Sequence, residues 1–240
     1  MRHAFIICAI LAVASPAAAA PFAYATTIEG DFGVLDLGSG AYVHCGYTGT
    51  ALFGLAVGPH GVLYGMDTGY FYRVNPHTGA LTHIAPAANY RVALGSAANL
   101  IYAVDSNANL FTVDPETGAE AAAGSGAPAP AFVFVLSAGA QTLYESTSAG
   151  LYDFIPKQGV AHRKNRDHSV EWGGLALVDR VLYGVGTPTE ELTQYIYTID
   201  TQTGTATQHA PLAITVSQIT GVAPAASDNT GTCRVTASSD

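Results

Sequence analysis

Short apolar runs, interrupted by glycine and by Asp or Asn, recur along this chain with a period near 40 residues. The clearest copy is LYGMDTGYFYRVNPHTGALTHI at 63–84. A tyrosine marks the second run of each copy and a turn glycine closes the third: Tyr24, Tyr64, Tyr102, Tyr144 and Tyr183, with Gly40, Gly79, Gly118, Gly159 and Gly204. Repeats of about 40–50 residues built from short strands are typical of a β-propeller, because one unit cannot bury its faces alone.

Each copy predicts four strands, A to D from the centre outward. Strand A has a Gly-Leu-Ala-like core, as in GLAV at 54–57, RVAL at 91–94, GLAL at 174–177 and GVAP at 221–224, with VLSA at 135–138 as the divergent copy. Strand B is the LYG-type run, and strand D resembles ALTHIAP. The low share of charged residues, 11%, and the 26 glycines fit short buried strands joined by tight turns.

Strand C ends in an Asx residue followed closely by Thr-Gly, as in VNPHTG, VDPETG and IDTQTG. An Asx side chain can accept a hydrogen bond from the backbone two residues on, and glycine can adopt a positive φ. We therefore predict tight C-to-D hairpins, in which the Asx residues are structural rather than catalytic. These residues are Asp36, Asn75, Asp114 and Asp200.

The two ends of the chain complement each other. Residues 22–49 supply strands B, C and D without a strand A, whereas 217–224 supply a strand A with no blade behind it. The sequence therefore predicts an all-β fold, a five-bladed β-propeller of four-stranded blades, closed by the C-terminal strand pairing into the N-terminal blade. Closure removes exposed sheet edges. A disulfide between Cys45 and Cys233 would clasp the tail over that blade, and free or intermolecular thiols are the alternative.

The first residues, MRHAFIICAILAVASPAAAA, have one firm charge, an apolar run and then small residues, which is the pattern of a secretory signal peptide. We place the signal at 1–19, since cleavage after Ala25 would remove a predicted strand. The propeller then covers 20–226, with a linker at 127–130, and 227–240 is a flexible tail. We expect a bacterial protein that is secreted or periplasmic.

Charge limits the partners of the chain. Without Arg2, 8 basic residues stand against 18 acidic ones, a net charge of −10 with histidine neutral. Such a surface repels phosphate backbones and anionic lipid heads, so we expect no nucleic-acid binding and no membrane insertion. We expect a monomer.

The sequence pattern of strands B and C, LYxxD…LYxVDPxTGxxT, resembles the repeats of secreted bacterial propellers of the YVTN and PQQ-like kind over about residues 22–224. This resemblance implies the architecture, in a superfamily that mixes binding proteins with enzymes. The chain departs from the quinoprotein pattern because Trp172 is its single tryptophan. The resemblance therefore implies no cofactor and no catalytic residue, and we expect no metal.

Propeller ligands usually sit at the mouth of the central channel, on the face framed by the D-to-A and B-to-C loops, which we name the top face. Aromatic rings beside Arg, Glu and Gln there suit a small polar ligand, with Arg gripping a carboxylate or phosphate. The predicted ligand-binding residues are Tyr90, Arg91, Phe132, Glu171, Trp172 and Gln218. The alternative is that the aromatic rings only plug the channel mouth.

The loop AHRKNRDH at 161–168 departs from the repeat, with three basic residues in an acidic protein. It could hold an acidic partner or an anion in a pH-dependent manner, or it could simply be a solvated loop. The residues concerned are His162, Arg163, Lys164, Arg166 and His168. The segment DSNAN at 105–109 partly resembles a calcium loop, but lacks its glycine and is better explained as a hairpin turn.

We therefore favour an exported propeller that binds a small polar ligand or a protein partner through its top face, without catalysis. The main alternative is a hydrolase, glycosidase-like or lactonase-like, with its active site at the channel mouth. Glycoside chemistry needs two facing carboxylates, and Glu171 is the only one on a predicted inner strand, so Asp67, Asp105 or Glu145 would have to approach it. A structural scaffold at the cell envelope is the third possibility.

Overall fold

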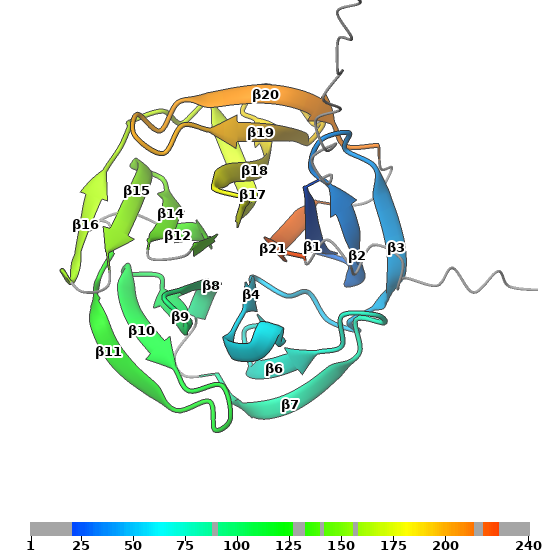
Figure 1. Ribbon diagram of the computed structural model, residues 1–240, viewed down its shortest axis with the longest axis vertical. Coiled ribbons are helices and arrows are strands. Elements are labelled where there is room, and N and C mark those ends of the chain that lie inside the picture. The colour runs from blue at the N-terminus through cyan, green and yellow to red at the C-terminus, as the bar shows by residue number, and fades with distance from the viewer. Residues whose placement is uncertain are drawn as a thin grey trace, which may run out of the picture.

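The computed structural model describes residues 21–87, 91–126, 133–139, 142–155, 158–213 and 218–225. Its strands are arranged around a common centre (Figure 1). The expected signal peptide, the linker at 127–130, the tail and Cys233 lie outside these ranges, so the predicted Cys45–Cys233 bridge stays a prediction. Within the described residues no helix has the length and apolar character needed to span a bilayer.

Three of the sheets have four strands each. The first has the order β21 (Ile219–Pro224), β1 (Phe22–Thr27), β2 (Asp31–Asp36) and β3 (Tyr42–Tyr47). The second contains β4 (Leu55–Val57), β5 (Leu63–Met66), β6 (Tyr70–Val74) and β7 (Leu81–Pro86), with the short helix η1 (Pro59–Gly61) between β4 and β5. The third contains β17 (Val170–Val178), β18 (Val181–Pro188), β19 (Tyr195–Ile199) and β20 (Ala206–Pro211).

The remaining strands form one sheet of nine. Its order is β12 (Val133–Leu136), β14 (Leu143–Thr147), β15 (Gly150–Ile155), β16 (Val160–Arg163), β11 (Glu120–Ser125), β10 (Asn109–Val113), β9 (Leu100–Asp105), β8 (Arg91–Ala97) and β13 (Ala138–Gly139). The sheet consists of two antiparallel groups, joined by a single parallel pair between Ser125 and Val160. The short strand β13 adds a second parallel contact, to β8.

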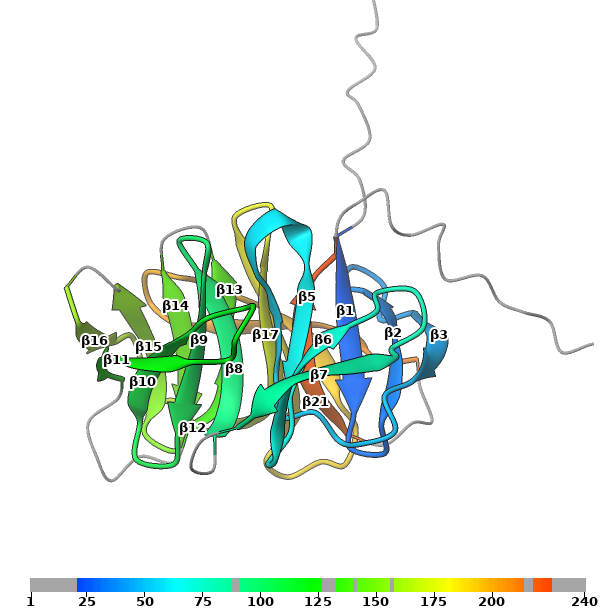
Figure 2. The ribbon, with the colours of Figure 1, turned by 90° about the horizontal axis from the view of Figure 1, so that it is seen from below.

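The all-β prediction is therefore confirmed, and so is the predicted pairing of the chain ends. Strand β21 pairs antiparallel with β1, Ala25 opposite Val222, although almost the whole chain separates them. Seen from the side, inner strands such as β8 and β17 run along the short axis of the molecule, whereas β7 and β11 cross it (Figure 2). This rotation from inner to outer strands is the ordinary twist of a β-sheet.

Apolar clusters fill the spaces between neighbouring sheets. One contains Leu35 of β2, Val185 of β18 and Val222 of β21, all at most 3% exposed. Glycines let the inner strands approach each other: a Cβ on Gly54 would overlap the backbone nitrogen of Leu94, and one on Gly174 would overlap Val222. The repeated glycine of strand A therefore permits close contact between neighbouring sheets.

The predicted C-to-D turns are confirmed in detail. Asp114 Oδ1 accepts hydrogen bonds from the amides of Glu116 and Thr117, at 3.0 and 2.8 Å. Gly118 follows with a φ of +68°. Asp36, Asn75 and Asp200 make the equivalent bonds, and Gly40, Gly79 and Gly204 have φ values between +72° and +79°. These Asx side chains are acceptors inside hairpin turns.

Candidate ligand-binding pocket

A pocket of about 390 Å³ lies where four segments meet: the β14–β15 turn, the segment leading into β17, the end of β18 and the residue before β21. It brings together Glu171, Trp172 and Gln218 of the predicted ligand-binding set and His168 of the predicted basic loop. Its lining residues are Ser146, Thr147, Ser148, Asp167, His168, Val170, Glu171, Trp172, Thr189 and Gln218.

Trp172 gives the pocket an aromatic wall. A Cβ on Gly184 or Gly186 of the neighbouring strand β18 would overlap or crowd the indole, so these glycines make room for the ring against the sheet. Tyr197 of β19 contacts the indole edge to face, with ring centroids 5.1 Å apart and an interplanar angle of 75°. Trp172 as a whole is partly exposed, and it packs against the apolar cluster that contains Leu175 and Ile199.

Two carboxylates line the pocket, Glu171 on β17 and Asp167 before it. Asp167 Oδ1 accepts a hydrogen bond from the amide of Ser169 at 2.9 Å. That bond, supported by the Ser169 hydroxyl and the nearby His168, outweighs burial and holds the pKa of Asp167 below its ordinary value. Asp167 is therefore ionised at neutral pH. Glu171 is exposed.

Three residues with hydroxyl groups, Ser146, Thr147 and Ser148, line the side of the pocket formed by the β14–β15 turn. Ser146 and Thr147 are 3% and 4% exposed. Thr147 Oγ1 accepts from the amide of Ala149 at 3.0 Å and donates to the carbonyl of Gly150 at 3.2 Å, which fixes the turn. Across the pocket, the amide of Thr189 donates to the carbonyl of Ser169 at 3.0 Å and holds the segment before β17 against β18.

Gln218 is positioned through its backbone and its neighbour. Its carbonyl accepts a hydrogen bond from the amide of Ile28 at 2.9 Å. The next amide, that of Ile219, donates to Gln194 Oε1, also at 2.9 Å. The other end of that amide, Gln194 Nε2, is buried and has no hydrogen-bond partner among the described residues. It lies 3.1 Å from the position of a Cβ on Gly173, next to the Trp172 wall.

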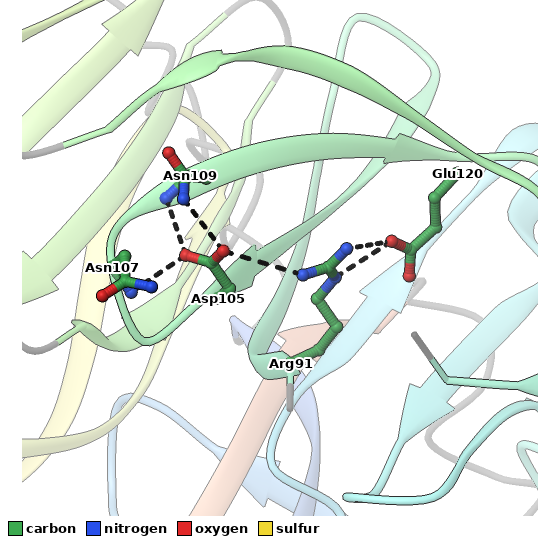
Figure 3. Close-up of polar contacts among 5 residues, drawn as sticks. All are labelled: Arg91, Asp105, Asn107, Asn109 and Glu120. Carbon is green, nitrogen blue, oxygen red and sulfur yellow. Dashed lines mark hydrogen bonds and ion pairs between the residues drawn. The ribbon is translucent and has the colours of Figure 1, made fainter. Parts of the chain in front are cut away.

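Arg91 does not line this pocket. Its side chain is 4% exposed and forms an ion pair with Glu120, in which Nε donates to Oε2 at 3.0 Å and Nη2 is a second donor (Figure 3). Nη1 lies 3.9 Å from Asp105 Oδ2, and the guanidinium stacks 3.6 Å from the centre of the Phe111 ring. The structure thus gives the predicted ligand-gripping arginine a buried set of partners within its own sheet.

Asp105, the other partner of Arg91, also forms the turn that follows β9. Its Oδ1 accepts from the amides of Asn107 and Asn109, both at 2.9 Å, and Oδ2 accepts from Asn109 Nδ2 at 3.0 Å (Figure 3). The DSNAN segment is therefore a hairpin turn stabilised by its first carboxylate, as the sequence indicates. The remaining predicted ligand residues, Tyr90 and Phe132, lie outside the described residues.

The residues of the basic loop lie in different places in the structure, and two of them contact Asp153 of β15. Lys164 Nζ lies 2.7 Å from Asp153 Oδ2, and His162 Nδ1 lies 3.5 Å from Asp153 Oδ1, so both face β15. Asn165 links two sheets, accepting from the amide of Leu151 at 3.0 Å and donating to the carbonyl of Gly204 at 2.6 Å.

The other basic-loop residues differ in position. Arg163 and Arg166 are exposed, whereas His168 lines the pocket.

The carboxylate partner of Glu171 in the pocket is one that the sequence argument did not consider. Asp67 accepts from the amides of Gly69 and Tyr70, each at 2.7 Å, in a turn of its own. Glu145 is fully buried in β14. The pocket instead contains Asp167. This residue could have been considered from the sequence, because it is the one carboxylate within the basic loop AHRKNRDH. Thr189 and Ser148 carried no sequence signal, because their place depends on how the turns converge.

No protein-family model matches the sequence, and no curated protein matches it. Among solved structures, a chain of a nidogen/laminin complex has a TM-score of 0.53 at 14% identity, over 86% of this chain and 98% of that one. The extracellular domain of BT4673 from B. thetaiotaomicron has a TM-score of 0.48 at 17% identity, over 84% of this chain and 28% of that one.

PorZ, a surface component of the type-IX secretion system of Porphyromonas gingivalis, has a TM-score of 0.46 at 14% identity, over 82% of this chain and 26% of that one. The chain therefore spans only about a quarter of these two bacterial chains. At such low identity, the likeness to the nidogen/laminin structure concerns the fold alone.

Proposed function

We propose that this chain is an exported five-bladed β-propeller that binds a small polar ligand in the pocket around Glu171, Trp172 and Gln218, without catalysis. The observation that carries the proposal is the pocket itself, which is lined by a tryptophan together with residues that bear carboxylate, hydroxyl and amide groups. A concave site with one aromatic surface and a few converging polar groups is the usual form of a small-molecule site.

The strand pairing supports five blades. The nine-stranded sheet contains two antiparallel groups, β8 to β11 and β12 with β14 to β16, which are joined by one parallel pair of residues. Counted separately, these groups and the three four-stranded sheets give five units of four strands, with β13 as an addition. The pairing of β21 with β1 supports closure of the ring. The signal-like first residues support export to the periplasm or the medium.

The charged residues that line the pocket restrict the charge of the ligand. Among the described residues that line the pocket there is no lysine or arginine, whereas Asp167 and Glu171 are both acidic. Since the Arg91 guanidinium is held by Glu120, we leave Arg91 out of the proposed site. An anionic ligand would meet two carboxylates, with the imidazole of His168 as the basic group among the described lining residues, so we propose a neutral or cationic ligand.

A melting-temperature screen tests this proposal. A compound that binds only the folded chain raises the melting temperature, by the equivalent of about 2.7 kcal/mol at a concentration of 100 Kd. We expect a neutral or cationic compound to do so in the wild type, and the shift to be lost in a Glu171→Gln/Gln218→Ala variant. The matched control is Glu116→Gln/Gln158→Ala, which changes the same residue types outside the pocket. A shift that persists in the first variant would place the ligand elsewhere.

A glycosidase is the second candidate, because the pocket contains two carboxylates, Asp167 and Glu171. Glycoside hydrolysis needs one carboxyl group whose pKa is raised so that it can donate a proton. The pKa of Asp167 is lowered instead, and Glu171 is exposed, which favours binding over catalysis. Turnover of a chromogenic glycoside by the wild type, abolished by Glu171→Gln, would reverse this choice.

A further inference from the structure

We infer that the ligand of this pocket is an uncharged saccharide. The inference rests on the proposed binding function and goes beyond it, since it names the chemical class of the ligand. Three features of the pocket carry it: the mixture of hydrogen-bond donors and acceptors, the fixed indole wall and the sign of the charge.

The polar groups require a ligand that both donates and accepts hydrogen bonds. The carboxylates of Asp167 and Glu171 only accept, whereas the amides and hydroxyls of Gln218 and Thr189 do both. Amines only donate at neutral pH, and carboxylates or phosphates only accept. A row of alcohol groups does both at each position, because every hydroxyl carries one proton and two lone pairs. A sugar ring therefore matches the whole lining.

One donor beside the pocket is still without a partner. Gln194 Nε2 is buried between the segments that carry Trp172 and Gln218, and no described residue accepts its protons. An unsatisfied buried donor costs about 1–3 kcal/mol in the empty state. Gln194 is not among the residues that line the pocket, so a ligand would reach this donor only through a bridging water, which the hydroxyl groups of a sugar can hold in place.

Trp172 supplies a surface for the apolar side of the sugar. The indole lies against Gly184 and Gly186 and is held at its edge by Tyr197, so its orientation is set before a ligand arrives. A flat ring whose position is fixed loses little conformational freedom on binding. The C–H groups on one face of a pyranose can pack on such a ring, while its equatorial hydroxyls remain free to reach the polar groups around it.

The charge of the lining separates neutral sugars from acidic ones. Asp167 is held in its ionised form by the Ser169 amide and lines the same pocket as Glu171. Lys164, on the nearby basic loop, lies 2.7 Å from a carboxylate oxygen of Asp153. A uronic acid would therefore bring a third negative charge into the pocket without a lysine or arginine among its described lining residues.

The tryptophan provides a direct test, because Trp172 is the only one in the chain and it lines the pocket. Its fluorescence is titrated with glucose, galactose, mannose and N-acetylglucosamine, with glucuronate and galacturonate as charged counterparts, and with choline and its uncharged analogue 3,3-dimethylbutanol. We expect a saturable change with at least one neutral sugar, and binding of the matching uronate weaker by about tenfold or more.

Two variants test whether the sugar binds in this pocket. Glu171→Gln removes the negative charge and replaces one acceptor oxygen by an NH₂ donor. We therefore expect it to weaken binding of the neutral sugar by about tenfold, and to reduce the difference in affinity between the neutral sugar and the uronate. Glu116→Gln, on the exposed β10–β11 turn outside the pocket, is the matched control and should leave both affinities unchanged. Equal weakening by both variants would overturn the assignment of the sugar to this pocket.

The outcomes separate the inference from the proposed function. If choline changes the emission saturably and no neutral sugar does, the saccharide inference is wrong and the pocket remains a ligand site. If a uronate binds as well as its neutral counterpart, the inference is also wrong. If no compound of any class changes the emission or the melting temperature, both the inference and the proposed function are wrong.

Discussion

At the scale of single residues, Arg91 has its described partners within its own sheet. In the strand register the counterpart of Gly174 and Gly221 is Ala93, two residues after Arg91. The Arg91 guanidinium contacts Glu120, Asp105 and the face of Phe111. The side chains of Arg91, Glu120 and Asp105 are 4%, 12% and 15% exposed. Removing one partner of a buried ion pair leaves a charge without compensation, which is the costly change at such a site.

We expect Arg91→Ala to lower the free energy of unfolding by roughly 3 kcal/mol, because Glu120 would remain buried without its partner. The control is Arg73→Ala, which removes a pair with Glu116 in which the side chains are 50% and 75% exposed. Such exposed pairs contribute at most about 1 kcal/mol. Urea unfolding measures both. Equal losses in the two variants would show that the Arg91 pair is no more important than a surface contact.

The sequence analysis predicts Arg91 to be a ligand-binding residue, but the sequence could not show where its side chain points. A long side chain at the start of an inner strand can reach outward over its own sheet or inward to the channel. Glu120 lies 29 positions away in the sequence, and nothing in the repeat marks it as the partner. Trp172 lies against Gly184 and Gly186, and the need for these glycines becomes visible only once the pairing of β17 with β18 is known.

At the scale of the elements, the C-to-D turn is the part of the repeat most completely determined by local sequence. Hydrogen bonds from the amide and hydroxyl of Thr117, then from the amide of Glu116, hold the pKa of Asp114 below its ordinary value. The amides of Thr203 and Gln202 lower the pKa of Asp200 in the same way. The equivalent turn with Asn75 uses a side chain that does not titrate.

These turns predict how stability changes in acid. A carboxyl group with a lowered pKa in the folded state stabilises the fold above its unfolded pKa of about 3.9. That contribution is lost as the pH falls through the folded-state pKa. We expect the melting temperature to fall below pH about 4, and to fall less steeply in Asp114→Asn/Asp200→Asn, which copies the natural turn at Asn75.

The comparison requires the melting temperature of wild type and variant from pH 7 to pH 2. The variant should lie slightly below the wild type at neutral pH, since an amide oxygen is a weaker acceptor than a carboxylate, and the two curves should converge in acid. Glu190→Gln, on an exposed turn, serves as the control. Parallel curves over the whole range would mean that these turn carboxylates do not contribute to the acid response.

The strands themselves could be predicted because their signal repeats. The tyrosine of the second run and the glycine after the third run recur in each copy, so errors in one copy are corrected by the others. The parallel pair between Ser125 and Val160 and the short strand β13 could not be predicted. Both depend on how two neighbouring groups of strands settle against each other, and neither has a counterpart in the other copies.

At the scale of the whole molecule, the two chain ends share one sheet. Strand β21 covers the edge of β1, and the hydroxyl of Thr220 donates to the carbonyl of Leu52 at 2.7 Å, which links the first two sheets. This arrangement followed from a missing strand at one end and an extra strand at the other. The position of the pocket did not follow from the sequence in the same way, because it depends on the convergence of turns from three sheets.

The pairing of β21 with β1 leads to the last prediction. A chain that ends at Gln218 lacks Ile219 and Val222, which are 0% and 3% exposed, and leaves the edge of β1 unpaired from Ala23 to Thr27. Burying one such side chain contributes about 1.5–3 kcal/mol, against a total stability of about 5–15 kcal/mol for a typical protein. We expect the shortened chain to lose its cooperative melting transition and to associate through the open edge.

A peptide with the sequence of residues 219–225 should restore cooperative melting when added to the shortened chain, since it can pair with β1 as β21 does. The same peptide with Val222→Asp is the matched control and should fail, because it would place a charge among Leu35, Val185 and Ile196. Circular dichroism follows the transition and size-exclusion chromatography follows the association. If the shortened chain melts cooperatively as a monomer at the temperature of the full chain, the C-terminal strand does not stabilise the closed arrangement, and its pairing with β1 is incidental to the fold.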